Sequence, residues 1–154
     1  MMKLHLPNLE AMIRFAETLA AELQAPQLVY LKGDLGAGKS TLARAFIQVL
    51  TSPDMEVPSP TFTLVQTYQT PKGEVWHYDL YRLKHSEEIW ELGFEDALHQ
   101  GIVLVEWPER LEGVSFTNQP LVISLAHEGE GRRAVLDGEA ALLGRLRHLE
   151  EGLP

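Results

Sequence analysis

The stretch that decides the fold is Gly33-Asp34-Leu35-Gly36-Ala37-Gly38-Lys39-Ser40. It follows a short apolar run, 28–31, and it precedes a helix-prone segment, 41–47. In this setting the glycines let backbone N–H groups curl around phosphate oxygens, and the helix points the positive end of its dipole at the same anion. The pattern therefore predicts a phosphate-binding loop (P-loop) and a nucleoside triphosphate ligand.

Two side chains of this loop have expected roles that follow from their chemistry. Lys39 is expected to reach the β- and γ-phosphates, and the hydroxyl of Ser40 is expected to bind Mg²⁺. The other loop positions expected to contact the nucleotide are Asp34, Gly36, Ala37 and Gly38.

Size and composition favour a single α/β domain over residues 1–154. The 154 residues are 45% hydrophobic, which suffices for one core but not for two comfortable domains. Cysteine is absent, which excludes disulfides and thiolate chemistry and favours the cytoplasm. No apolar run approaches the length of a membrane span or a signal peptide, so we expect no membrane association.

The charge balance bears on nucleic-acid binding. The formal net charge is −9, from 13 Lys and Arg against 22 Asp and Glu. An autonomous nucleic-acid binder presents a basic face to phosphates, which this balance disfavours. We therefore expect a partner to hold any nucleic acid that the protein serves.

Periodicity and turn residues predict the remaining elements. Helical spacing indicates helices over 9–23, 41–50, 86–92, 94–98 and 139–150. Apolar or alternating runs indicate strands over 28–31, 63–69, 74–80, 102–105, 120–127 and 132–136. The helix over 9–23 would begin at Pro7-Asn8 and bury Leu9 and Ile13, and Ser86 would cap the helix over 86–92. We expect a P-loop NTPase-like mixed sheet with a parallel centre and antiparallel hairpins, flanked by helices.

Two carboxylates are candidates for the metal and for catalysis. Glu106 ends the central strand, where the second acid of P-loop proteins usually lies, and Asp79 ends a hairpin strand. We assign Glu106 to Mg²⁺, directly or through water, and Asp79 to the attacking water or to the outer sphere of the metal. On sequence alone the two roles are interchangeable.

Three further residues, Thr61, Arg132 and Trp107, have both a functional and a plainer interpretation. Thr61 lies in the proline-stiffened loop 57–61, where a hydroxyl can touch the γ-phosphate or Mg²⁺, or can simply stabilise a turn. Arg132, near a glycine-rich hairpin tip, is a phosphate or base contact or a solvated side chain. Trp107 packs on the base or fills the core rim. Strand alternation turns His77 to the same face as Asp79.

Four segments, in matching order and spacing, closely resemble the bacterial TsaE family. They are Gly33-Asp34-Leu35-Gly36-Ala37-Gly38-Lys39-Ser40-Thr41, Ser59-Pro60-Thr61-Phe62-Thr63-Leu64-Val65, His77-Tyr78-Asp79-Leu80-Tyr81-Arg82-Leu83 and Val105-Glu106-Trp107-Pro108-Glu109. Members are small ATPases required for making threonylcarbamoyladenosine beside the anticodon of tRNAs that read codons starting with adenine. The resemblance implies a cytoplasmic ATP hydrolase that acts with TsaB and TsaD, is slow alone, and meets tRNA only through that complex.

The resemblance also implies site roles. Lys39, Ser40 and Thr41 would hold phosphates and Mg²⁺, Thr61 would lie in a switch-like loop, and Glu106 would be a metal ligand. Asp79 would be essential for hydrolysis. Arg132 would fall at a nucleotide contact, and Leu9 would border the adenine.

Three other functions are compatible with a P-loop. A small-molecule or nucleoside kinase also needs an acceptor site and an arginine-bearing lid, and no such lid stands out in the sequence. A GTP-dependent switch would carry a guanine-reading Asn-Lys-x-Asp motif, which the sequence lacks. A nucleotide-sensing scaffold would bind ATP without useful hydrolysis.

Overall fold

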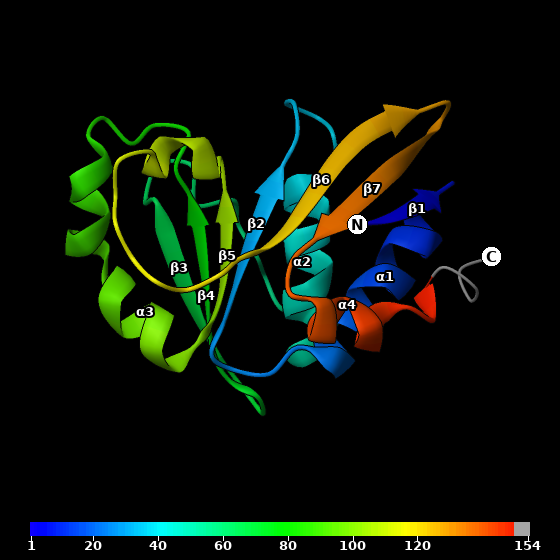
Figure 1. Cartoon of the computed structure of the whole chain (residues 1–154), viewed down its shortest axis with the longest axis horizontal. Helices are drawn as coiled ribbons and strands as arrows, with labels where there is room; N and C mark the ends of the chain where they lie inside the picture. Colours follow the sequence, from blue (N-terminus) through cyan, green and yellow to red (C-terminus); the bar gives the residue numbers. More distant parts are fainter. Residues whose placement is uncertain (150–154) are drawn as a thin grey trace.

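A seven-stranded sheet organises the chain, whose residues 1–149 are described in this computed structural model (Figure 1). Its strands are β1 (Met2–Leu6), β2 (Gln27–Lys32), β3 (Val65–Thr70), β4 (Gly73–Asp79), β5 (Ile102–Glu106), β6 (Leu121–Glu128) and β7 (Gly131–Asp137). The helices are α1 (Leu9–Glu22), α2 (Lys39–Leu50), α3 (Phe94–Gln100), α4 (Ala140–Leu146) and the 3₁₀ helices η1 (Ser86–Leu92) and η2 (Pro108–Leu111). The strand order, β1-β7-β6-β2-β5-β4-β3, places β2 in the middle.

The centre of the sheet is parallel and its edges are antiparallel. β2 lies between β5 and β6 and runs parallel to both, and β4 runs parallel to β5. The hairpins β3–β4 and β6–β7 are antiparallel, and β1 pairs antiparallel with β7. All five residues of β5 are buried, as expected for a parallel strand covered on both faces. The predicted P-loop NTPase-like α/β fold is confirmed.

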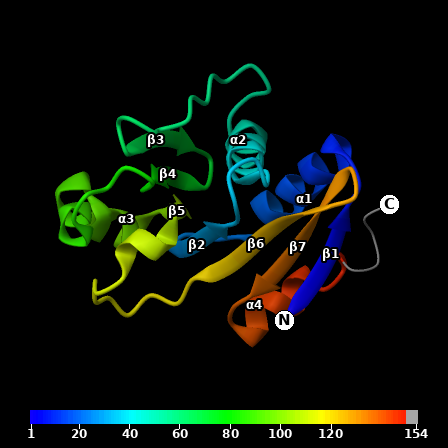
Figure 2. The ribbon, with the colours of Figure 1, turned by 90° about the horizontal axis from the view of Figure 1, so that it is seen from above.

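The two faces of the sheet have separate apolar clusters. Phe15 of α1 and Phe46 of α2 belong to one cluster with Leu104 of β5, whereas Tyr78 and Phe94 belong to the other. Seen from above, α1 and α2 lie on one side of the central strands and α3 lies on the other (Figure 2). Residues alternate between the faces along each strand. The strand ends therefore present a defined set of side chains to α2.

The sequence analysis missed β1. Met2, Leu4 and Leu6 are buried while Lys3 and His5 are exposed, so the segment alternates like a half-buried strand. Its pairing partner is β7, which lies about 130 residues later in the sequence. A five-residue alternation is too short to identify a strand by itself, and the edge of β7 decides its structure.

The buried face of helix α1 differs from the predicted one. Asn8 caps it as predicted, since its side-chain oxygen accepts from the backbone N–H of Ala11 at 2.9 Å. Leu9 and Ile13, however, are 61% and 39% exposed. The face of α1 that is buried consists instead of Ala11, Met12, Phe15, Ala16, Leu19 and Ala20. Leu9 and Ile13 were both wrongly assigned to the core.

Other boundaries also differ from expectation. The segment 86–92 is a 3₁₀ helix whose N-cap is His85 rather than Ser86, because the His85 N–H donates to the carboxylate of Glu88 at 2.9 Å. Helix α4 ends at Leu146, and the predicted helix end at Glu150 lies outside the described residues. Over residues 1–149, the helices are all too short or too polar to cross a membrane.

Gly101 allows a test of the packing against β4, and Gly144 in α4 serves as the comparison. A Cβ at Gly101 would lie 2.7 Å from Cδ1 of Trp76 and 2.9 Å from the carbonyl oxygen of Glu74, whereas a Cβ at Gly144 in α4 would meet nothing within 4 Å. We expect Gly101→Ala to lower the free energy of unfolding by about 1–3 kcal/mol through overpacking. Gly144→Ala should raise it by about 0.5–1 kcal/mol, because alanine is the better helix former. Urea unfolding followed by circular dichroism measures both, and equal stabilities would contradict this packing.

Candidate functional site

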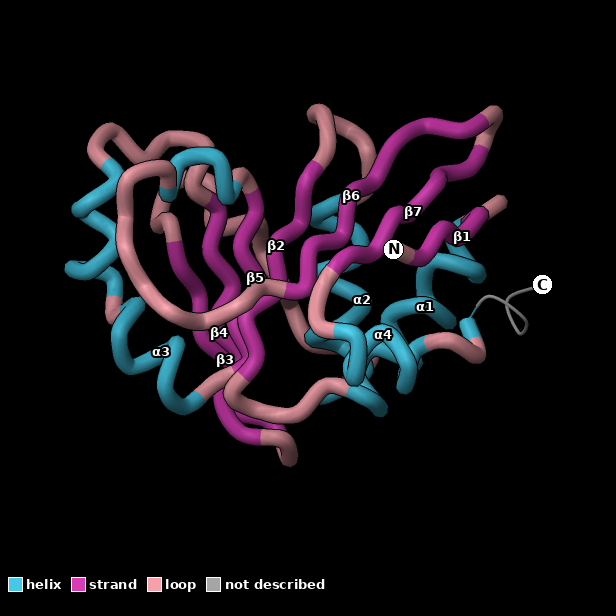
Figure 3. Tube along the Cα trace, viewed as in Figure 1, coloured by secondary structure: helices cyan, strands magenta, loops and turns pink. Residues whose placement is uncertain are grey.

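Three central strands end beside the N-terminus of α2. The loop 33–38 follows β2, Asp79 is the last residue of β4, and Glu106 is the last residue of β5. The parallel register places Glu106 directly between Leu31 of β2 and Asp79 of β4. These strand ends share one edge of the sheet (Figure 3). This is the edge at which open α/β sheets bind ligands.

The loop has a conformation that requires glycine. Gly33, Gly36 and Gly38 have φ values of +147°, +81° and +110°. A Cβ at Gly33 would also lie only 2.5 Å from the backbone oxygen of Leu125 in β6. Gly38 is the N-cap of the 12-residue helix α2 and has no side chain with which to cap it. The first-turn N–H groups of α2 are therefore left for an anion.

Lys39 is folded back over this loop. Its ammonium donates to the backbone carbonyls of Gly33 and Asp34, the latter at 3.1 Å, and lies 4.1 Å from the centre of the Trp107 ring. Burial lowers the pKa of the ammonium, and nearby carboxylates, with Glu106 first among them, oppose that shift. Trp107 has a left-handed backbone with φ of +61°, a conformation that non-glycine residues rarely adopt.

Glu106 is a buried carboxylate with a donor on each oxygen. Its Oε1 accepts from the hydroxyl of Ser40 at 2.9 Å, and its Oε2 lies 2.7 Å from Nε2 of His77. Its side chain is 2% exposed, so these hydrogen bonds offset much of the cost of burying the charge. The expectation that His77, and not Tyr78, faces the site is confirmed, because the Tyr78 hydroxyl donates to Leu92 on the opposite side.

Asp79 connects the sheet edge to the loop before β3. Its Oδ2 accepts from the hydroxyls of Thr61 at 3.3 Å and Ser59 at 3.5 Å, and its Oδ1 accepts from the backbone N–H of Tyr81 at 3.1 Å. Its own N–H donates to the carbonyl of Leu64, another non-glycine residue with positive φ. The geometry of loop 59–64 is thus tied to this one carboxylate.

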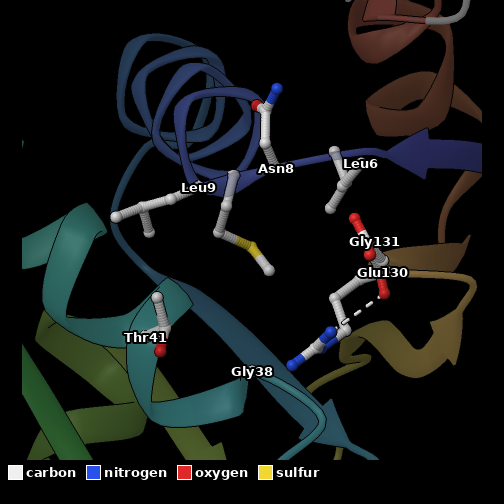
Figure 4. Close-up of a pocket in the computed structure, with 9 residues that line it drawn as sticks. Leu6, Asn8, Leu9, Gly38, Thr41, Glu130 and Gly131 are labelled. Carbon is white, nitrogen blue, oxygen red and sulfur yellow. Dashed lines mark hydrogen bonds between the residues drawn. The ribbon is translucent and has the colours of Figure 1, made fainter.

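Two adjoining pockets flank the N-terminus of α2. The polar pocket has a volume of about 300 Å³ and includes Ser40, Thr61, Asp79, Glu106 and Trp107 among its lining residues. The second has a volume of about 220 Å³ and a more apolar lining, with Leu9 and Thr41 on one side and Gly131 on the other (Figure 4). Gly38, Thr41 and Arg132 line both. Together they have room for a polar and an apolar part of one ligand.

Arg132 reaches the loop from β7. Its Nε donates to the carbonyl of Ala37 at 3.0 Å and its Nη2 to the carbonyl of Gly36 at 3.2 Å. The plainer interpretation of a solvated arginine is therefore wrong. By contrast, Asp34 and Ala37 are not among the residues lining either pocket, and their backbone carbonyls instead hold Lys39 and Arg132.

The structure brings most of the expected site residues together, and it adds Ser59. The Ser59 hydroxyl lies 2.8 Å from that of Thr61, so the two share the Asp79 carboxylate. The sequence analysis assigned Ser59 no role, although its spacing of two from Thr61 was a signal that could have identified it.

The donor set suits a hard cation. Ser40 Oγ and Glu106 Oε1 are neutral and anionic oxygens 2.9 Å apart beside the phosphate-binding loop. Mg²⁺ prefers oxygen ligands and takes only one or two from the protein when phosphates supply others. Residues 1–149 form no group of three or more His, Cys, Asp or Glu side chains able to hold a metal. The residues fit a cation delivered with a nucleotide rather than a separate all-protein site.

Comparison with known proteins gives consistent matches. Residues 6–135 match the family model described as threonylcarbamoyl adenosine biosynthesis protein TsaE. The chain is 47% identical to a tRNA threonylcarbamoyladenosine biosynthesis protein TsaE of Rickettsia prowazekii, over 62% of this chain and 66% of that protein. The chain is 38% identical to the protein of the same description in Haemophilus influenzae, over 71% of this chain and 73% of that protein. The match thus spans slightly less than two thirds of the Rickettsia prowazekii protein.

A solved structure is also similar. The crystal structure of Bacillus subtilis YdiB superposes with a TM-score of 0.68 at 25% identity. The superposition covers 97% of this chain and 94% of YdiB. The similarity therefore extends over nearly the whole fold.

The Ser40–Glu106 hydrogen bond is open to a double-mutant cycle. Hydrogen bonds to buried charges contribute about 1.5–3 kcal/mol, so Ser40→Ala, Glu106→Ala and the double variant should show a coupling of about 1–3 kcal/mol in the free energy of unfolding. As a control, Thr70→Ala at the tip of the β3–β4 hairpin should combine additively with Glu106→Ala, within about 0.5 kcal/mol. Additivity in both cycles would show that the buried bond does not form in solution.

Proposed function

This chain belongs to the TsaE family of threonylcarbamoyl adenosine biosynthesis proteins, and from that premise we propose that it is a Mg²⁺-dependent ATP hydrolase serving threonylcarbamoyladenosine modification of tRNA. The observation that carries the proposal is the pairing of Ser40 with Glu106 next to the glycine-lined start of α2. Phosphates, metal and a second carboxylate, Asp79, can meet there.

Each residue of the polar pocket has a role in this proposal. The N–H groups of the loop and the ammonium of Lys39 bind the phosphates, with Lys39 exchanging the carbonyls of its own loop for phosphate oxygens. Ser40 and Glu106 hold Mg²⁺, which supplies charge neutralisation on the phosphate oxygens when bound. Glu106 is preferred over Asp79 as metal ligand because its Oε1 already contacts Ser40.

Asp79 and Thr61 belong to the hydrolytic step. Asp79 lines the same pocket as Gly36 and Gly38 of the loop, and its carboxylate can orient a water toward the terminal phosphate. The Thr61 hydroxyl donates a hydrogen bond to Asp79, so binding a phosphate or the metal would require this hydroxyl to give up that bond. Loop 59–64 would thereby respond to whether a γ-phosphate is present.

The apolar pocket is suited to the base. Leu9 is exposed at its edge, and Met12 and Thr41 line it near Gly38, where the loop enters α2. An adenine placed there would cover Leu9 and leave the triphosphate along the loop. Arg132 lines both pockets and is within reach of either part of the nucleotide.

The partners in this proposal are TsaB and TsaD, with tRNA held by the complex rather than by this acidic chain. Two exposed aromatic side chains adjoin residues that line the polar pocket: Phe62, 82% exposed, follows Thr61, and Tyr81, 39% exposed, packs against Trp107. We call these two side chains the aromatic rim. Arg82 stacks over Phe62 at 4.8 Å, and Tyr81 lies 5.0 Å from Trp107. Exposed aromatic and arginine side chains are favoured at protein interfaces. Phe62 belongs to loop 59–64, which Asp79 holds, so a change at the nucleotide could alter the surface to which a partner binds.

Substitutions separate binding from hydrolysis. Lys39→Ala should abolish ATP binding measured by calorimetry, because the phosphates lose their buried ammonium. Asp79→Asn and Glu106→Gln should still bind ATP but hydrolyse it about 10²-fold more slowly or worse, measured as phosphate release. Wild-type turnover by both carboxylate variants, combined with lost function in Lys39→Ala, would instead favour a nucleotide-sensing scaffold.

The kinase alternative is not favoured, because the relatives are named for tRNA modification. The same assay tests it when a panel of nucleosides is included. We expect the γ-phosphate to go to water, and faster transfer to a nucleoside would overturn the hydrolase assignment. Addition of TsaB, TsaD and tRNA should raise the hydrolysis rate.

The aromatic rim gives a separate prediction about partners. Phe62→Ala and Tyr81→Ala should each weaken binding to a TsaB–TsaD complex by about tenfold or more, as truncation of an interface hot spot does. Trp90→Ala is the matched control, since Trp90 is 40% exposed but belongs to η1. Biolayer interferometry measures all three. Wild-type affinity in both rim variants would remove the rim from the interface.

A further inference from the structure

Glu106 has a buried partner for which the proposed hydrolysis has no direct use. Nε2 of His77 lies 2.7 Å from Glu106 Oε2, and the His77 side chain is only 1% exposed. The other oxygen of Glu106, Oε1, accepts from Ser40. The carboxylate therefore has one oxygen turned toward the phosphate-binding loop and one turned into the sheet.

The sheet register brings His77 to the carboxylate from within. His77 pairs with Leu104, and Asp79 pairs with Glu106, so His77 and Glu106 are diagonal neighbours on the same face of two parallel strands. His77 is not among the described residues that line either pocket. It lies behind Glu106, as seen from the polar pocket, and has no access to a bound nucleotide except through that carboxylate.

The hydrogen bonding of His77 is committed to Glu106. A carboxylate can only accept, so Nε2 is the donor. Nδ1 is buried and has no hydrogen-bond partner among residues 1–149. A ring with its hydrogen on Nε2 leaves Nδ1 without one, which avoids burying an unpaired N–H. Among the described residues, the one hydrogen-bond partner of the His77 side chain is therefore Glu106.

We propose that His77 is a positioning residue for the metal site, and that it holds the Glu106 carboxylate in the orientation that presents Oε1 beside Ser40. The inference rests on the proposed function, because it concerns the Mg²⁺ that accompanies the nucleotide. Without the His77 donor, Oε2 of Glu106 would be a buried, charged oxygen with no hydrogen bond. The carboxylate could then rotate to bring this oxygen toward Ser40 or Lys39. Loss of such an outer hydrogen bond typically lowers metal affinity about 10–100-fold.

The test compares nucleotide binding with and without metal. ADP affinity is measured by calorimetry in Mg²⁺ and in EDTA for wild type, His77→Leu, His77→Asn and His77→Gln. Leucine removes the donor, and asparagine has an amide too short to reach Glu106. Glutamine places an amide N–H near the former Nε2. We expect His77→Leu and His77→Asn to lose about 10–100-fold of the Mg²⁺-dependent gain in affinity, with EDTA values within about twofold of wild type.

Rescue and controls distinguish a positioning role from a structural one. His77→Gln should recover most of the metal-dependent gain, and His99→Gln on α3 should change nothing. Thermal unfolding identifies any variant that does not fold, in which case the asparagine variant carries the comparison. An unchanged Mg²⁺-dependent gain in His77→Asn, or equal losses in Mg²⁺ and EDTA, would overturn the inference. If wild type itself gains no affinity from Mg²⁺, the proposed function fails instead.

Discussion

The buried carboxylate of Glu106 is the constraint on which the site depends. A charge that is 2% exposed at the end of a central strand is costly unless each oxygen is hydrogen-bonded. Its donors come from Ser40 and His77, which lie 66 and 29 residues away in the sequence. Both can reach it only because β5 pairs in parallel with β2 and β4, and because α2 begins immediately after the loop that follows β2. Satisfying one charge thus fixes the relative positions of two strands and one helix.

Asp79 extends this constraint from the core to the surface. It stands beside Glu106 in the sheet, yet its oxygens bind the hydroxyls of loop 59–64 and the backbone at Tyr81. The same segments carry the exposed side chains of Phe62, next to Thr61, and of Tyr81, which packs against Trp107. A change at the phosphates therefore has a short route, through one carboxylate, to side chains that a partner protein could touch. This arrangement suits the proposed ATPase, whose output would be a change in affinity for its proposed partners.

Local patterns were sufficient for the elements whose periodicity is strong. The wholly apolar run that became β5, the two hairpins and the helix after the glycine loop were all predicted, because burial on a particular face leaves its period in the sequence. Expectations failed where a distant or specific contact decides the outcome. β1 depends on the edge of β7, and the cap of η1 depends on the His85–Glu88 bond. Leu9 and Ile13 fit a helical stripe but lie outside the one that α1 buries.

The sequence by itself predicted a glycine-rich loop between a strand and a helix at residues 33–38, and predicted that a carboxylate ends each of two strands, at Asp79 and at Glu106. Those features follow from glycine's backbone freedom and from periodicity, which are properties of short segments. Only the tertiary structure decided that Glu106 pairs with Ser40 and His77, that Asp79 holds loop 59–64, and that Arg132 secures the loop from a strand about 95 residues away. Hydrogen bonds are made or lost within a few tenths of an ångström, and that precision comes from strand register and helix docking rather than from any local pattern.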